Sequence, residues 1–162
     1  MASTYEKIQS TTLGGTGTIT FSSIPATYTD LKIIMTQTTD GANVGIRFNS
    51  DSGSNYSWTR LQGDGSTASS ANTTNATFGQ LNGNGTSGTY QGLVNVDIFS
   101  YAGSTYKTLL SNFSNDQNGS GNTAQTVNLW RSTLAITSIL LFAAGGDLQA
   151  NTTATLYGIL KA

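Results

Sequence analysis

The side chains that could do chemistry in this sequence are concentrated between residues 47 and 60. Arg47 and Arg60 are two of only seven basic residues, and they enclose Asp51, Tyr56 and Trp58. Carboxylate and guanidinium groups beside aromatic rings can bind a sugar through hydrogen bonds and stacking. We therefore single out these five residues as a candidate ligand-binding set. The two-residue spacing of Tyr56 and Trp58 is also typical of side chains buried on one face of a strand, so core packing stays open as the alternative.

Catalysis and metal binding have few residues to draw on. The chain has no cysteine and no histidine, which removes thiol chemistry and the commonest general base and transition-metal ligand. Asp51 paired with Asp64 or Asp97 could act as the two carboxylates of a glycosidase, and Asp51 with Asp64 could ligate calcium. Most aspartates, however, lie beside Gly, Ser or Asn, where the capping of turns accounts for them. We expect no enzyme, no catalytic residue, no metal site and no cofactor.

Composition is that of a small neutral globular protein. The chain has 162 residues, which fits one domain with one core. Charged residues make up 9% and the formal net charge is −1, so the chain has no long-range field and we expect neither nucleic acid nor a membrane as partner. No apolar run approaches the roughly 20 residues that span a bilayer, and the first eight residues lack the apolar stretch of a signal sequence.

Strands must position the candidate residues. Apolar and polar residues alternate with a period of two in 30–37, 93–99 and 154–160. No segment longer than ten residues has the 3.6-residue apolar period of a helix. Short strands separated by Gly, Asn and Ser turns predict an all-β fold, an antiparallel two-sheet sandwich of jelly-roll type with about eight to ten strands.

Local pairing and the core follow from the same patterns. The runs 46–48 and 56–59 flank a Ser/Gly/Asn turn and predict one hairpin, and 90–101 with 106–113 predict another. The low-complexity segment 62–77 is either a surface excursion or a flat edge strand. The residues expected to share the core are Ile33, Val96, Ile98, Leu129, Leu140 and Tyr157.

Four stretches of strand-and-turn sequence follow one another along the chain, at residues 19–31, 47–56, 129–139 and 154–159. Together they resemble a module that recurs in structural proteins of tailed bacteriophages. The resemblance implies a jelly-roll domain without enzymatic activity on the outside of virions, as head decoration, head fibre or tail fibre. The chain has no coiled-coil, collagen-like or triple-β shaft sequence, which favours a small capsid decoration or cement protein. A tail-fibre or head-fibre domain that binds a host receptor or surface glycan is the alternative.

The resemblance also bears on assembly, because it implies a homotrimer that contacts the major capsid protein or other virion proteins. Residues 1–16 precede a single sandwich domain over 17–162 and end in a Gly-rich hinge. Tyr5, Ile8 and Leu13 are the apolar residues of this polar segment, and we assign them to contacts with sister subunits or the capsid. The segment is either an arm that reaches these neighbours or a first edge strand.

Overall fold

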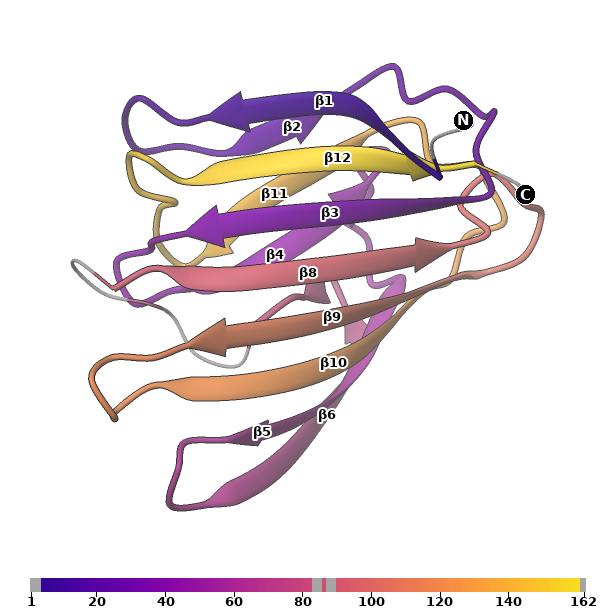
Figure 1. Cartoon of the computed structure of the whole chain (residues 1–162). Helices are drawn as coiled ribbons and strands as arrows, with labels where there is room; N and C mark the ends of the chain where they lie inside the picture. The colour runs from indigo at the N-terminus through magenta and orange to yellow at the C-terminus, as the bar shows by residue number, and fades with distance from the viewer. Residues whose placement is uncertain (1–3, 83–85, 87–89, 161–162) are drawn as a thin grey trace.

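The computed structural model describes residues 4–82, 86 and 90–160, and this part of the chain is built from strands without a helix. The strands are β1 (Tyr5–Thr12), β2 (Ile19–Phe21), β3 (Asp30–Gln37), β4 (Asn43–Phe48), β5 (Tyr56–Gly63), β6 (Ala68–Ala76), β7 (Gly79–Gln80), β8 (Gly92–Phe99), β9 (Lys107–Asn115), β10 (Asn122–Trp130), β11 (Ile139–Ala144) and β12 (Thr153–Ile159). They form two antiparallel sheets that pack face to face, as Figure 1 shows. The predicted two-sheet sandwich is therefore confirmed.

The order of the strands is that of a jelly roll with two inserted hairpins. One sheet has the order β1-β12-β3-β8-β9-β10-β5-β6 and the other has the order β2-β11-β4-β7. Strands β1, β12, β3 and β8 face β2, β11, β4 and β7, and the chain alternates between these two sets except where β4 leads to its own neighbour β7. The pair β5–β6 is inserted between β4 and β7, and the pair β9–β10 between β8 and β11. These four extra strands extend the larger sheet, and they account for a strand total above the expected eight to ten.

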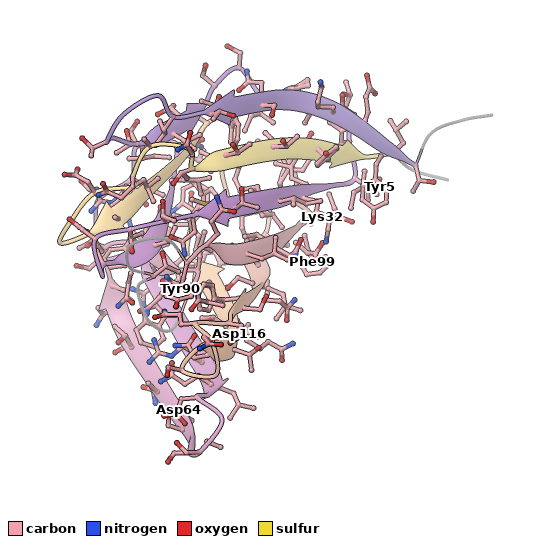
Figure 2. All side chains as sticks on the ribbon, turned by 60° about the vertical axis from the view of Figure 1, so that its left-hand side comes forward. Tyr5, Lys32, Asp64, Tyr90, Phe99 and Asp116 are labelled. Carbon is pink, nitrogen blue, oxygen red and sulfur yellow. The ribbon has the colours of Figure 1, made fainter. Side chains whose placement is uncertain are left out.

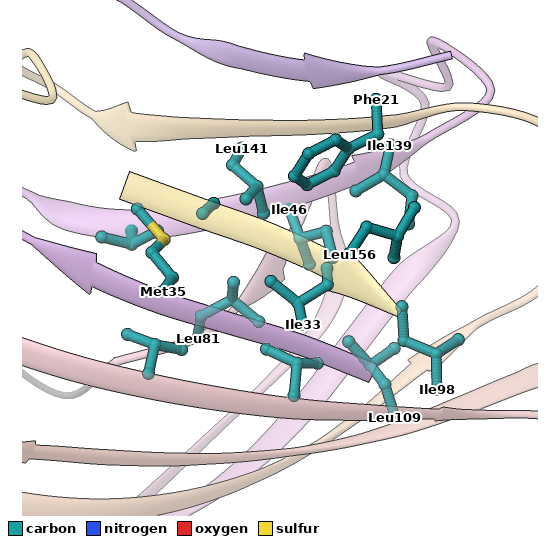
Figure 3. Packing of buried hydrophobic residues seen from close by; sticks show 14 of the residues in the cluster. Phe21, Ile33, Met35, Ile46, Leu81, Ile98, Leu109, Ile139, Leu141 and Leu156 are labelled. Carbon is teal, nitrogen blue, oxygen red and sulfur yellow. The ribbon is translucent and has the colours of Figure 1, made fainter. Parts of the chain in front are cut away.

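Three of the predicted core residues are confirmed, and they lie in the two central strands. Ile33 of β3 and Val96 and Ile98 of β8 are at most 1% exposed. In Figure 3 Ile33 and Ile98 lie among buried side chains from several strands, including Leu156 of β12 and Ile46 of β4. The alternation in these strands points every second side chain between the sheets, as the period of two requires.

The other three predicted core residues lie one position out of register. Leu129, Leu140 and Tyr157 are only partly buried, on the outward faces of their strands. The inward positions belong to their chain neighbours, which are Trp130 in β10, Ile139 and Leu141 in β11, and Leu156 in β12. A shift of one residue sends every side chain of a strand to the opposite face, so these three assignments were wrong together with the faces they implied.

Of the two predicted hairpins one is confirmed and one is wrong. Strands β8 and β9 pair from Leu93 opposite Ser114 to Phe99 opposite Thr108. Strands β4 and β5 lie in different sheets and do not pair with each other; β5 pairs instead with β10 and β6. The segment between them is a corner that carries the chain from one sheet to the other. Segment 62–77 contains the edge strand β6, one of its two predicted forms.

Candidate functional site

A corner cluster of aromatic residues surrounds Asp51, where the chain crosses from β4 to β5. Trp130 Nε1 donates a hydrogen bond to Asp51 Oδ2 over 2.7 Å, and the backbone N–H of Gly53 donates to Asp51 Oδ1 over 2.9 Å. The Trp130 ring lies 5.3 Å from the Phe48 ring and 6.3 Å from the Tyr56 ring, measured between centroids. We call Phe48, Asp51, Tyr56 and Trp130 the corner cluster. It joins the two sheets at this end of the sandwich.

The groups of the corner cluster satisfy one another. The Tyr56 hydroxyl accepts from the backbone N–H of Phe48 over 3.0 Å and donates to the carbonyl of Asp51 over 3.3 Å. Burial raises the pKa of this hydroxyl. Burial on its own also raises the pKa of Asp51, but hydrogen bonds from Trp130, Gly53 and Asn55 outweigh it and leave the pKa below its usual value. Asp51 is therefore held as a carboxylate whose partners belong to the protein itself.

A second group of polar residues lies on the inner face of β5, beyond the edge of the smaller sheet. Arg60 lies opposite Thr126 of β10, and its guanidinium carbon is 5.5 Å from the centre of the Trp58 ring. Arg60 Nε, Gln62 Oε1 and Thr126 Oγ1 are buried and have no hydrogen-bond partner in the described part of the chain. We call Trp58, Arg60, Gln62 and Thr126 the inner-face cluster. Buried polar atoms nearly always have a partner, so this cluster can accept water or a hydroxylated ligand.

The five candidate ligand residues therefore do not form one site. Asp51 and Tyr56 belong to the corner cluster, and Trp58 and Arg60 belong to the inner-face cluster. Arg47 lies on the outward side of β4, where its Nε donates to the carbonyl of Thr77 over 3.0 Å and its guanidinium carbon lies 4.7 Å from the centre of the Phe142 ring. Of the five, Trp58 and Arg60 are the two whose cluster contains buried polar atoms without a partner in the described residues.

The aspartates proposed as partners of Asp51 have structural roles of their own. Asp64 Oδ1 accepts from the backbone N–H groups of Ser66 and Thr67 over 2.9 and 2.7 Å, which is the predicted capping of a turn. These hydrogen bonds lower the pKa of Asp64. Asp97 forms an ion pair with Lys32 over 2.6 Å. Within the residues that the structure describes, no three His, Cys, Asp or Glu side chains lie close enough together to hold a metal ion.

A broad hollow lies at the end of the sandwich formed by the β5–β6 and β9–β10 turns. It has a volume of about 640 Å³, and Asp64, Gln91, Asn115, Asp116 and Asn122 are among its lining residues. Figure 2 shows Asp64 and Asp116 at this end of the molecule. Asp116 Oδ1 accepts from the backbone N–H of Gly119 over 2.8 Å, so it too caps its own turn. This hollow is wide open, and its two carboxylates are committed to the loops that carry them.

The amino-terminal contact residues are placed differently from one another. Strand β1 pairs with β12 from Tyr5 opposite Ile159 to Thr12 opposite Thr153 and forms one edge of the larger sheet. Ile8 and Leu13 are partly buried against the protein's own core, whereas Tyr5 is 50% exposed. Of the three predicted contact residues, Tyr5 is therefore the one with the most surface to offer a neighbour.

An apolar area on the outer face of the larger sheet was not singled out by sequence reasoning. Phe99 is 46% and Val127 is 48% exposed on this face, and Figure 2 shows Tyr5, Lys32 and Phe99 projecting from the same side of the sheet. We call Tyr5, Phe99 and Val127, with the Lys32–Asp97 ion pair between them, the outer-face patch. Half-buried apolar residues fill the space between its members: Leu110, Leu129, Tyr157 and Ile159. The sequence signal for Phe99 was the alternation of β8, which places Phe99 on the face that does not carry the buried Val94, Val96 and Ile98.

Comparison with known protein families and with curated proteins finds no match for this chain. In the described residues no helix is long and apolar enough to cross a membrane.

Proposed function

We propose that this protein is a non-enzymatic structural protein of a tailed-phage virion, a decoration or cement protein on the outside of the head. Its partners are sister copies in a homotrimer and the major capsid protein. The phage assignment and the trimer come from the sequence resemblance. The observation that carries the contact role is the outer-face patch, because a broad sheet face with exposed apolar side chains is a surface suited to binding another protein.

The chemistry of the outer-face patch fits close packing against a neutral protein surface. Lys32 and Asp97 form an ion pair within the patch, so that their charges neutralise each other. Burying a paired charge and neutral polar groups costs far less than burying an unpaired charge. Large aromatic side chains such as Tyr5 and Phe99 contribute most of the binding energy in many protein interfaces. The patch therefore offers two aromatic anchors around a paired charge, with the exposed Lys7 at its edge opposite Tyr157.

Tyr5 links this surface to the contact assigned to the amino-terminal segment. It lies opposite Ile159 at the edge of the sheet, on the same face as Phe99. Because β1 pairs with β12 from Tyr5 to Thr12 and Ile8 packs against the core, deletion of residues 2–12 would remove part of the sandwich as well as the contact. Substitution of exposed side chains separates these two effects.

The substitution Phe99→Lys tests the proposed contact. Its side chain is exposed, so the thermal midpoint is expected to change little, whereas binding to empty heads that lack this chain is expected to weaken at least about tenfold. Binding is measured by co-sedimentation of labelled protein with the heads. Thr20→Lys adds the same charge at an exposed position of the smaller sheet and is expected to bind like the wild type. Equal binding by Phe99→Lys and wild type would exclude the outer-face patch as the capsid contact.

The alternative function, glycan binding by a tail-fibre or head-fibre domain, is favoured by the inner-face cluster. Trp58 offers a ring for stacking, and Arg60, Gln62 and Thr126 have unpartnered atoms that can hydrogen-bond sugar hydroxyls. Under this function, host-surface polysaccharide is expected to change the tryptophan fluorescence of the wild type, and Gln62→Ala is expected to weaken that response. If the fluorescence of the wild type does not change at saturating polysaccharide, the cluster holds water only and the glycan function is rejected.

A further inference from the structure

The two sheets have four edge strands, and three of them are protected against pairing with another chain. Strands β2 and β7 are only three and two residues long. Strand β1 carries Glu6 and Lys7, and its register with β12 shifts between Lys7 and Gln9. Short length, charge and irregular register are the devices by which proteins prevent association of exposed strand edges.

Strand β6 has little of this protection. It is nine residues long and mostly exposed, and it forms the free edge of the larger sheet next to β5, at the lower end of Figure 1. Residues 65–96 contain no charged residue and no proline. Its one irregularity lies near its end, where Asn75 has a φ of 57° and its side chain accepts from Arg131 Nη2 over 2.8 Å. The stretch 68–73 is therefore a regular, uncharged edge with unused backbone hydrogen-bonding groups.

We propose that β6 pairs antiparallel with β6 of a second copy of this chain, which joins two eight-stranded sheets edge to edge. The sequence of the stretch suits a two-fold pairing centred on Ala71. Within the regular stretch the facing pairs are Ser69 with Thr73, Ser70 with Asn72, and Ala71 with itself. Every pair consists of small or neutral polar side chains, so the contact is self-complementary, as a two-fold interface requires.

This inference rests on the free edge alone and does not depend on the virion function. Strands β1 and β6 lie at opposite ends of the larger sheet, so trimer contacts near Tyr5 leave β6 free to link neighbouring trimers. A pair of strands buries less surface than a standard protein interface, and the association is expected to be weak. It would gain strength where many copies are held side by side, because the effective local concentration is high.

Charge substitutions on the exposed face of β6 test the pairing by sedimentation equilibrium at concentrations up to about 1 mM. At low concentration the wild type has the mass of the oligomer that it forms through its other surfaces. With rising concentration this mass is expected to double. Ser70→Lys/Asn72→Lys places like charges across the two-fold axis and is expected to weaken this step at least about tenfold. Ser70→Glu/Asn72→Glu is expected to do the same, and an equimolar mixture of the two variants is expected to restore the doubling.

The matched control is Thr20→Lys/Ser22→Lys, which adds the same charge at exposed positions at the edge of the smaller sheet and is expected to associate like wild type. Thermal unfolding of each variant checks that the sandwich is intact. A wild type that keeps one mass over the whole concentration range overturns the proposal. So does a Ser70→Lys/Asn72→Lys variant that is folded and doubles its mass as wild type does.

Discussion

Replacement of Trp130 by alanine is expected to destabilise the fold by about 3–5 kcal/mol. Trp130 is 1% exposed, and its ring packs against Phe48 from the opposite sheet and Tyr56 from the neighbouring strand. Truncation leaves a cavity between the sheets that surrounding side chains fill only in part. It also removes the indole N–H from Asp51. The effect is measured as the free energy of unfolding from urea titrations followed by circular dichroism.

Trp130→Phe separates packing from hydrogen bonding in the corner cluster. Phenylalanine keeps most of the buried aromatic surface but has no N–H donor for Asp51, so the expected loss is about 1–3 kcal/mol. The two variants should therefore rank in stability as wild type, Trp130→Phe and Trp130→Ala. A Trp130→Ala protein within about 1 kcal/mol of wild type would mean that the indole is not buried between the sheets.

Asp51→Asn is expected to lower stability at neutral pH by about 1.5–3 kcal/mol, and the loss should shrink in acid. The pKa of Asp51 is lower in the folded state than in the unfolded chain. Its carboxylate therefore contributes stability above the unfolded pKa, and this contribution disappears as the pH falls through the folded pKa. Asparagine has the same shape but cannot supply the charge that accepts these hydrogen bonds. Urea midpoints of both proteins, measured from neutral pH down to about pH 2, follow the difference.

Asp116→Asn is the control for this pH dependence. Asp116 lies at an exposed turn, and its substitution is expected to change stability by no more than about 0.5 kcal/mol. A difference between Asp51→Asn and wild type that stays constant from neutral to acid pH would contradict the role of the charged carboxylate. A group other than Asp51 would then have to account for any dependence of the free energy of unfolding on pH in this range.

The fold class was predictable because β3 and β8 alternate cleanly between apolar and polar residues. The inward face of β10 was not predictable, because its inward positions include the polar Thr126 and Asn128, whereas the apolar Val127 points outward and is 48% exposed. Asn128 Oδ1 accepts from the backbone N–H of Gln80 over 2.7 Å, and its Nδ2 donates to the carbonyl of the same residue over 3.0 Å. A polar side chain thus faces inward to satisfy the edge of the other sheet, and no local pattern contains that partner.

Strand β11 illustrates a second limit, since its six consecutive apolar residues fit either register. Ile139 and Leu141 fill the core, whereas Phe142 lies on the outer side, where it contacts the Phe78 ring and the Arg47 guanidinium. The corner after β4 illustrates a third limit. Turn residues indicate that the chain reverses, but whether the flanking strands pair depends on Trp130, which lies 79 positions from its hydrogen-bond partner Asp51.

The candidate site was predictable only in part for the same reason. Residue types identified Asp51 and Tyr56 as unusual, yet their partners turned out to be the protein's own indole and backbone groups. Trp58 and Arg60 were found by type and spacing, but Gln62 and Thr126 were not, because the atoms they leave unpartnered are revealed only by the pairing of β5 with β10. The outer-face patch combines four strands that are distant in the sequence.

A cryo-electron microscopy reconstruction of the intact phage particle that carries this chain tests the proposed virion function most directly. The proposed function predicts jelly-roll density on the outside of the head, in groups of three, with the outer face of the eight-stranded sheet toward a protein neighbour. The β6 edges are predicted to face one another between neighbouring groups. A particle whose head surface shows no density that fits this sandwich would contradict the role as a decoration protein, and density on a fibre tip would favour glycan recognition instead.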